Sequence, residues 1–179
     1  MLWMKKKDKK AGTTLIGVCY NGKAALGTDF NPAKPDGDEI GAVKISSNAL
    51  VGFTGKGDGI VIYEKLLEKI ENCADLAIAA NEIAEAWKSD ENLALNGGNL
   101  VLFGPACAFL ITPGEAKQIP SGVIAVGPGQ EYALAAIRAI LAQPVVKESV
   151  EQVVKKAFTV SAGVCVMVNP GSTVICLEK

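Results

Sequence analysis

The sequence contains no histidine in its 179 residues. Imidazole is the general base of Ser-His-Asp and Cys-His catalysis and the commonest zinc ligand, so those site types are excluded. A hydroxyl nucleophile in this chain needs another base. The candidates are a lysine amine or the α-amino group of a chain terminus, whose ordinary pKa of about 7.7 to 8.0 suits proton transfer near neutral pH.

Thr13 is the best candidate for such a nucleophile. A threonine at a chain terminus supplies the hydroxyl and the amine in one residue. Thr13 would become the terminus if the chain were cut after Gly12, and glycine lets the backbone bend towards the neighbouring hydroxyl. We therefore interpret residues 1–12 as a removable propeptide and residues 13–179 as one domain.

Composition narrows the setting of this domain. Residues 1–12 hold five lysines and one aspartate, which leaves 13 basic and 18 acidic residues in the body. An acidic body argues against nucleic acid as a partner. Five cysteines without a CxxC pair indicate a reduced, cytoplasmic protein. The first residues lack the pattern of a secretory signal, and no apolar run is long enough to span a bilayer.

Hydrophobic periodicity predicts an alternation of strand pairs and helix pairs. The turn dipeptide Asn21-Gly22 favours a tight hairpin at the start of the domain. Two layers of sheet covered by pairs of helices are the most economical architecture for such an order. The predicted elements, in order, are a hairpin over 13–29, a hairpin over 42–55, helices over 60–70 and 76–87, strands between 98 and 127, helices over 131–142 and 146–160, and a hairpin over 163–179.

Four segments resemble proteasome β subunits and the HslV family. They are GTTLIGVCYNGKAALGTD (12–29), VGFTGKGD (51–58), AVGPGQEYALAAIRAIL (125–141) and GVCVMVN (163–169), so the resemblance covers the chain from Gly12 onwards. It implies the α+β class and the four-layer α-β-β-α sandwich of N-terminal-nucleophile hydrolases. Residues 13–179 would then be a proteasome-like peptidase domain, assembled into stacked rings with the active sites facing an inner chamber.

The resemblance implies a role for four residues, each of which has a simpler alternative. Thr13 matches the nucleophile, although two β-branched residues also begin many strands. Asp29 matches the aspartate that pairs with a lysine, and Lys44 matches that lysine, buried beside Asp29 and lowering the pKa of the threonine hydroxyl. An ordinary solvated lysine is the alternative for Lys44, and Lys34 is the other lysine of that loop. Gly52 matches the oxyanion-hole donor, although a strand glycine can also mark a bulge.

The clearest departure of the sequence from the family is at Pro128. Pro128 stands where these proteins usually have a serine that hydrogen-bonds the threonine amine, and Ser161 is a candidate substitute. HslV-like proteins also bind a monovalent cation or Mg²⁺ through backbone carbonyls. The matching residues here are Ala162, Cys165 and Val168, and carbonyl ligation depends little on side-chain identity.

These features predict a self-processing threonine endopeptidase that hydrolyses unfolded polypeptides through an acyl-enzyme on Thr13. The chemistry requires no cofactor, and a structural Na⁺ or Mg²⁺ is the implied ion. The implied partners are further copies of the chain in a double ring and an ATP-dependent unfoldase, with neither nucleic acid nor membrane. Two alternatives stay open: a catalytically silent ring subunit, and an amidase that acts on a small molecule.

Overall fold

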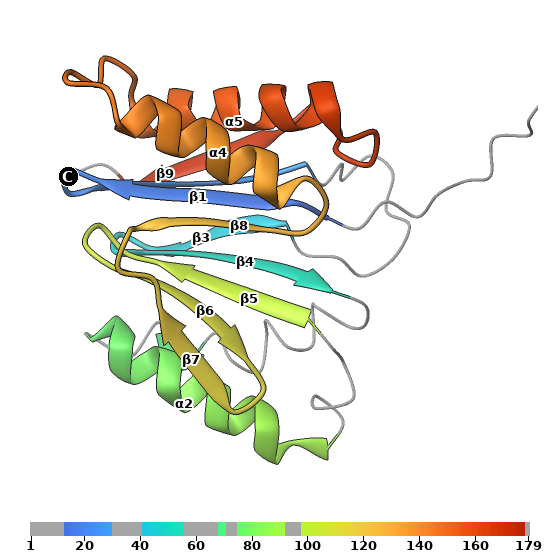
Figure 1. Ribbon diagram of the computed structural model, residues 1–179. Helices are drawn as coiled ribbons and strands as arrows, with labels where there is room; N and C mark the ends of the chain where they lie inside the picture. The colour runs from blue at the N-terminus through green and yellow to red at the C-terminus, as the bar shows by residue number, and fades with distance from the viewer. Residues whose placement is uncertain (1–12, 30–40, 56–67, 71–74, 92–97, 178–179) are drawn as a thin grey trace, which may run out of the picture.

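The computed structural model describes residues 13–29, 41–55, 68–70, 75–91 and 98–177, which form two antiparallel sheets stacked face to face with helices on both outer sides. Figure 1 shows the four layers, with α4 and α5 over one sheet and α2 under the other. The predicted α-β-β-α sandwich is confirmed. No helix in these described ranges is long and apolar enough to cross a membrane.

The first sheet has the strand order β8-β1-β2-β9. Its centre is the predicted hairpin of β1 (Leu15–Tyr20) and β2 (Lys23–Thr28), with β8 (Val123–Val126) and β9 (Thr173–Leu177) at its edges. Asn21 and Gly22 have φ values of 52° and 74°. Two successive positive φ values are what a type I′ hairpin turn requires, so the predicted turn is confirmed.

The second sheet has the strand order β3-β4-β5-β6-β7. Every neighbouring pair in it is antiparallel. Its central strands alternate apolar side chains towards the helices and towards the other sheet. The strands are β3 (Ala42–Ser46), β4 (Ala49–Gly55), β5 (Gly98–Phe103), β6 (Ala108–Thr112) and β7 (Glu115–Gln118).

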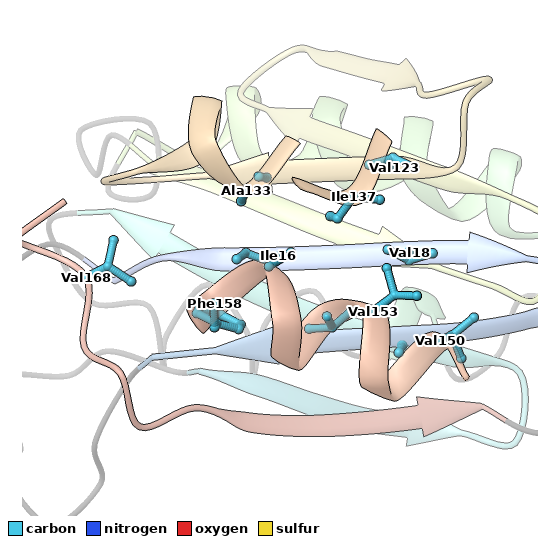
Figure 2. Close-up of a cluster of buried hydrophobic side chains, with 13 residues drawn as sticks. Ile16, Val18, Val123, Ala133, Ile137, Val150, Val153, Phe158 and Val168 are labelled. Carbon is cyan, nitrogen blue, oxygen red and sulfur yellow. The ribbon is translucent and has the colours of Figure 1, made fainter. Parts of the chain in front are cut away.

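Three helices, α2 (Leu76–Ser89), α4 (Gln130–Leu141) and α5 (Val150–Val164), cover the sheets as their periodicity predicts. Trp87 of α2 is fully buried against the second sheet, and Phe158 of α5 is buried against the first. Figure 2 shows how Ile16 and Val18 of β1 meet the side chains of α4 and α5. A third cluster, which includes Leu15, lies between the two sheets. The core therefore has three layers, one at each interface.

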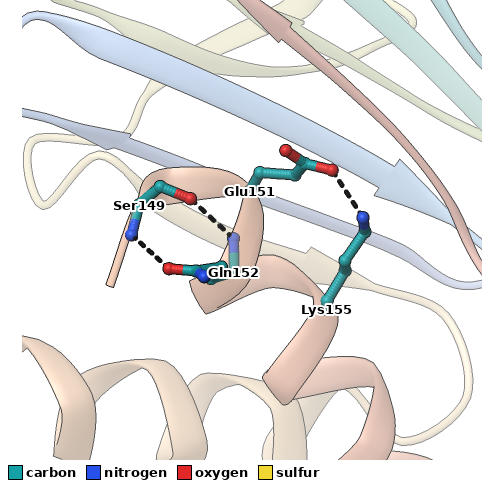
Figure 3. Close-up of polar contacts among 4 residues, drawn as sticks. All are labelled: Ser149, Glu151, Gln152 and Lys155. Atoms are coloured by element: carbon teal, nitrogen blue, oxygen red, sulfur yellow. Dashed lines mark hydrogen bonds and ion pairs between the residues drawn. The ribbon is translucent and has the colours of Figure 1, made fainter. Parts of the chain in front are cut away.

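The N-terminus of α5 has a complete capping box (Figure 3). The Ser149 hydroxyl accepts the N–H of Gln152, and the Gln152 side chain accepts the N–H of Ser149. Two backbone donors that would lack helical partners are thereby satisfied. The capping box therefore defines the residue at which α5 begins.

The predicted strand over 163–169 is wrong. α5 continues to Val164, and a turn follows in which the N–H of Val168 donates to the carbonyl of Cys165 at 3.1 Å. The edge of β2 is already occupied by β9, so an apolar segment here has no free strand edge beside β2 to join. The predicted helix over 60–70 lies mostly outside the described residues, of which 68–70 have helical backbone.

Candidate active site

Thr13 lies two residues before the start of β1, at one end of the interface between the sheets. The residue is buried, with 4% of its surface exposed. Side chains alternate along β1, and Leu15, two residues on, packs into the cluster between the sheets. The same alternation directs the Thr13 side chain towards the second sheet and the Thr14 side chain towards the helices.

The peptide unit between Thr13 and Thr14 is held from two sides. Asp29, directly after β2, accepts the N–H of Thr14 through Oδ1 at 2.6 Å. From the other sheet, the hydroxyl of Thr54 in β4 donates to the carbonyl oxygen of Thr13 at 2.8 Å. The backbone beside the candidate nucleophile is therefore fixed by its own neighbours, before any substrate binds.

The turn between β8 and α4 closes the site on a third side. The Thr14 hydroxyl donates to the carbonyl of Pro128 at 3.0 Å. Gly127 has a φ of 102°, and a Cβ there would lie 2.4 Å from the carbonyl oxygen of Thr13. Only glycine fits at this approach. Pro128 thus contributes a backbone acceptor at the position where the family has a serine hydroxyl.

Asp29 is the acidic group of the site and is 6% exposed. Its second oxygen, Oδ2, accepts the N–H of Asn169 at 3.0 Å, so the carboxylate joins β1 to the segment after α5. Burial raises the pKa of the Asp29 carboxyl above its ordinary value of 3.8, and the N–H donors of Thr14 and Asn169 act in the opposite direction. The carboxyl is therefore a positioning group whose charge is costly to keep.

Gly52, the candidate oxyanion donor, lies in β4 two residues before Thr54 and on the same face. A Cβ at Gly52 would approach both terminal methyl groups of Leu15 at 3.0 Å, so this part of β4 packs closely against β1. Gly52 pairs with Ala42 of β3 and Val101 of β5. The structure thus brings Gly52 next to the strand that begins at Thr13.

Lys44 does not occupy the expected buried position. It is exposed on the edge strand β3, where it pairs with Leu50. Leu50 lies four residues before Thr54, and at a rise of about 3.3 Å per residue this places Lys44 roughly 13 Å along the strand from the level of Thr54. In this arrangement Lys44 is a solvated strand lysine. Lys34 lies outside the described residues.

Ser161 does not replace the missing serine in this arrangement. It is fully buried on α5, and its hydroxyl donates to the carbonyl of Gly129 at 3.3 Å, which ties α5 to the β8–α4 turn. The candidate cation ligands lie next to it. Ala162 is in the last turn of α5, Cys165 is its C-cap, and Val168 closes the following turn.

Sequence reasoning missed Thr14, Thr54 and Asn169 as members of this site. Thr54 contacts a residue 41 positions away and Asn169 one 140 positions away, so no local spacing connects them. One signal was available for Thr54. It is a polar residue on the face of β4 that otherwise carries Leu50 and Gly52 towards the other sheet.

Comparison with known proteins gives a consistent answer. No family model matches the chain. The ATP-dependent protease subunit HslV of Chlorobium phaeobacteroides (strain BS1) is 27% identical over 172 residues, which is 91% of this chain and 93% of that protein. The crystal structure of eukaryotic HslV from Trypanosoma brucei matches with a TM-score of 0.77 and 26% identity, over 93% of this chain and 99% of that one. The chain is HslV-like in both sequence and fold.

Two structures of Thiobacillus denitrificans BPH, one of them in complex with epoxomicin, also match the HslV-like chain. Their TM-scores are 0.66 and 0.65 at 16% identity, and they cover 92% of this chain. At that identity they show the fold alone. The resemblance to HslV that the sequence suggested is confirmed, and it extends over nearly the whole chain, as the four matching segments predicted.

Proposed function

We propose that this HslV-like chain is a self-processing threonine endopeptidase, one subunit of a ring protease that hydrolyses unfolded polypeptides in the cytoplasm. The observation that carries the proposal is the double anchoring of the Thr13–Thr14 peptide unit by Asp29 and Thr54. It fixes one threonine at the junction of the two sheets, where the resemblance places the nucleophile. The sequence similarity to an HslV protease subunit, which covers 91% of this chain, supports the same proposal.

Activation would begin with attack of the Thr13 hydroxyl on the carbonyl carbon of Gly12. The new ester replaces the Gly12–Thr13 amide, which frees the α-amino group of Thr13. Water then hydrolyses the ester and releases the Thr13 hydroxyl and the carboxylate of Gly12. In the mature protein that amine takes the hydroxyl proton and passes it to the leaving amine of a substrate. Water hydrolyses the resulting acyl-enzyme, and Thr13 is regenerated.

Gly52 is the proposed oxyanion donor of both steps. Tetrahedral intermediates of acyl transfer are stabilised by backbone N–H groups fixed in advance. Gly52 is presented by the strand that also holds Thr13 through Thr54, so the distance between nucleophile and donor would be set by one strand. This scheme also calls for a lysine that lowers the pKa of the Thr13 hydroxyl. The exposure of Lys44 leaves Lys34 as the other candidate from the same loop.

A structural Na⁺ or Mg²⁺ bound by the carbonyls of Ala162, Cys165 and Val168 fits the local backbone. The last carbonyls of a helix lack intrahelical partners, and the Cys165 carbonyl keeps one lone pair beside the bond from Val168. Carbonyl oxygens suit hard cations. A bound ion would stiffen the segment that leads to Asn169, and titration calorimetry with each ion measures its affinity.

A catalytically silent ring subunit is the second candidate. Two observations favour it: Lys44 is exposed, and Pro128 offers a carbonyl where the family has a serine hydroxyl.

An amidase that acts on a small molecule would keep the same chemistry with a different substrate. A panel of fluorogenic peptides and small amides separates this third reading from the first.

The deciding experiment is intact-mass measurement of the purified protein before and after incubation with a threonine-directed epoxyketone. A self-processing peptidase should begin at Thr13 and gain one adduct, because the adduct requires a free N-terminal threonine. Thr13→Ala should stay full length and unmodified. A wild-type protein that keeps residues 1–12 and takes up no inhibitor would support the silent subunit.

A further inference from the structure

The Thr13–Thr14 peptide unit is bound at its two ends by groups from different sheets. Asp29 accepts its N–H from the end of β2, and Thr54 donates to its carbonyl oxygen from β4. In the chemistry proposed above, Thr13 and Gly52 act on the reacting atoms, whereas Thr54 enters only as a contact that marks the site. The effect of the Thr54 hydroxyl on the reaction itself has still to be derived.

The surroundings of Thr54 give its hydroxyl a purpose. The residue is 7% exposed, and buried hydroxyl groups in proteins have hydrogen-bond partners. Its neighbours on the same face of β4 are Leu50, which is buried between the sheets, and Gly52, so that face is otherwise apolar. Valine would fill the same volume without a polar atom. A threonine here supplies a donor, and the partner it reaches is the carbonyl of Thr13.

The contact also has a defined geometry relative to the proposed oxyanion donor. Thr54 and Gly52 are two residues apart on one strand, a separation of roughly 6.6 Å along β4. A nucleophile bound to Thr54 keeps a set position relative to Gly52. Gly127 of the β8–α4 turn lies close to the same carbonyl oxygen, which restricts the Thr13 backbone further. Small displacements of reacting groups cost large factors in rate.

We propose that Thr54 is a positioning residue whose hydroxyl tethers the carbonyl oxygen of Thr13 to β4 and so holds the nucleophile in register with Gly52. The inference rests on the proposed threonine-peptidase function. Thr54 itself exchanges no proton with substrate. Its effect should appear in kcat and in the rate of Gly12–Thr13 cleavage, with little change in KM, because the tether acts on the enzyme and not on substrate binding.

The test compares Thr54→Val, Thr54→Ser and wild type, with Thr112→Val at the end of β6 as a control for loss of a threonine hydroxyl outside the site. Three quantities are measured: the rate of precursor cleavage by mass spectrometry, kcat and KM for a fluorogenic peptide, and the thermal midpoint. Values of kcat are expressed per active site counted by the epoxyketone adduct. This count removes the effect of any unfolded fraction.

The expected result is a fall of at least about 10-fold in cleavage rate or kcat for Thr54→Val, with KM within about twofold. Thr54→Ser and Thr112→Val should stay within about threefold of wild type, since the tether needs only the hydroxyl. If Thr54→Val does not fold, Thr54→Ser against Thr54→Ala separates the hydroxyl from the methyl group. Equal loss in Thr54→Ser and Thr54→Val would overturn the tether in favour of packing.

The two hypotheses fail differently. An active wild type with an unimpaired Thr54→Val variant overturns the tether and leaves the proposed function standing. A wild type that neither cleaves itself nor binds the epoxyketone overturns both, because no nucleophile would then need to be positioned.

Discussion

The carboxyl group of Asp29 is buried, and its two oxygens accept two backbone N–H groups. Because burial raises its pKa above 3.8, the folded chain takes up a proton at a higher pH than the unfolded chain. The stability that this proton contributes is complete below pH 3.8 and is lost as the pH rises through the folded-state pKa. The group therefore works against stability at neutral pH while it organises the site.

We expect wild type to gain stability relative to Asp29→Asn as the pH falls from about 7 to about 4. The variant cannot titrate at this position and serves as the reference. Urea denaturation at fixed protein concentration, repeated along this pH series, measures the difference in the free energy of unfolding. Parallel curves for the two proteins would contradict the raised pKa.

The exposure of Lys44 reverses the expectation that the resemblance gave. Lys44→Ala should keep precursor cleavage and peptide hydrolysis within about threefold of wild type, because surface substitutions away from a site have small effects. Lys34→Ala is the matched comparison from the same stretch of sequence. Loss of activity on the order of 10²-fold in Lys44→Ala would show that the active protein moves this lysine into the site.

Much of the site was predictable because its key residues lie in short recognisable stretches. Thr13 and Asp29 sit at the two ends of the first hairpin, which the Asn21-Gly22 turn brings together. Thr54 and Asn169 were not predictable, since they reach the site through sheet stacking and through the turn after α5. Contacts of that kind depend on how layers pack, which local spacing does not encode.

At the scale of the elements, helices and hairpins were predicted well and the segment after α5 was not. Strong apolar periodicity marks α2, α4 and α5 in the sequence, and the side chains of Asp75 and Ser149 cap α2 and α5. Residues 163–169 have valine at every second position, a pattern that also suits a strand. The outcome is decided by available edges: β9 pairs with β2, and the segment forms a turn instead.

The β8–α4 turn should be intolerant of any side chain at Gly127. In Gly127→Ala, a residue with a φ of 102° would carry a Cβ 2.4 Å from the Thr13 carbonyl oxygen. We therefore expect the free energy of unfolding to fall by about 1 to 3 kcal/mol. Gly163→Ala in the last turn of α5 is the matched control. Its Cβ would meet nothing within 4 Å, and a gain of about 0.5 kcal/mol is expected. Thermal denaturation of both variants tests the contrast.

At the scale of the whole molecule, the outer surface of the helical layer carries apolar side chains. Val160 and Val164 at the end of α5 and Val166 just after it are 45%, 58% and 88% exposed. Exposed apolar groups gathered on one segment are typical of protein interfaces. They support the proposal that copies of this chain assemble into closed rings.

Light scattering of purified wild type at micromolar concentration should therefore give the mass of a ring assembly. Val164→Glu should lower that mass while the far-UV circular dichroism stays unchanged, because the side chain faces solvent in the isolated subunit. Lys155→Glu, about two and a half helical turns away on the same helix, is the control for a change of charge. A wild type that runs as a monomer would contradict the assembly.

The anchoring of the Thr13–Thr14 peptide unit also affects how rigid a new N-terminus at Thr13 would be. New termini ordinarily fray, since the first residues of a chain have few neighbours to restrain them. Here the two bonds from Asp29 and Thr54 lie on the far side of the scissile linkage from the segment that departs. Cutting after Gly12 would therefore release charge and mass without loosening what is left behind. The protein would gain a reactive terminus that is as rigid as an interior strand.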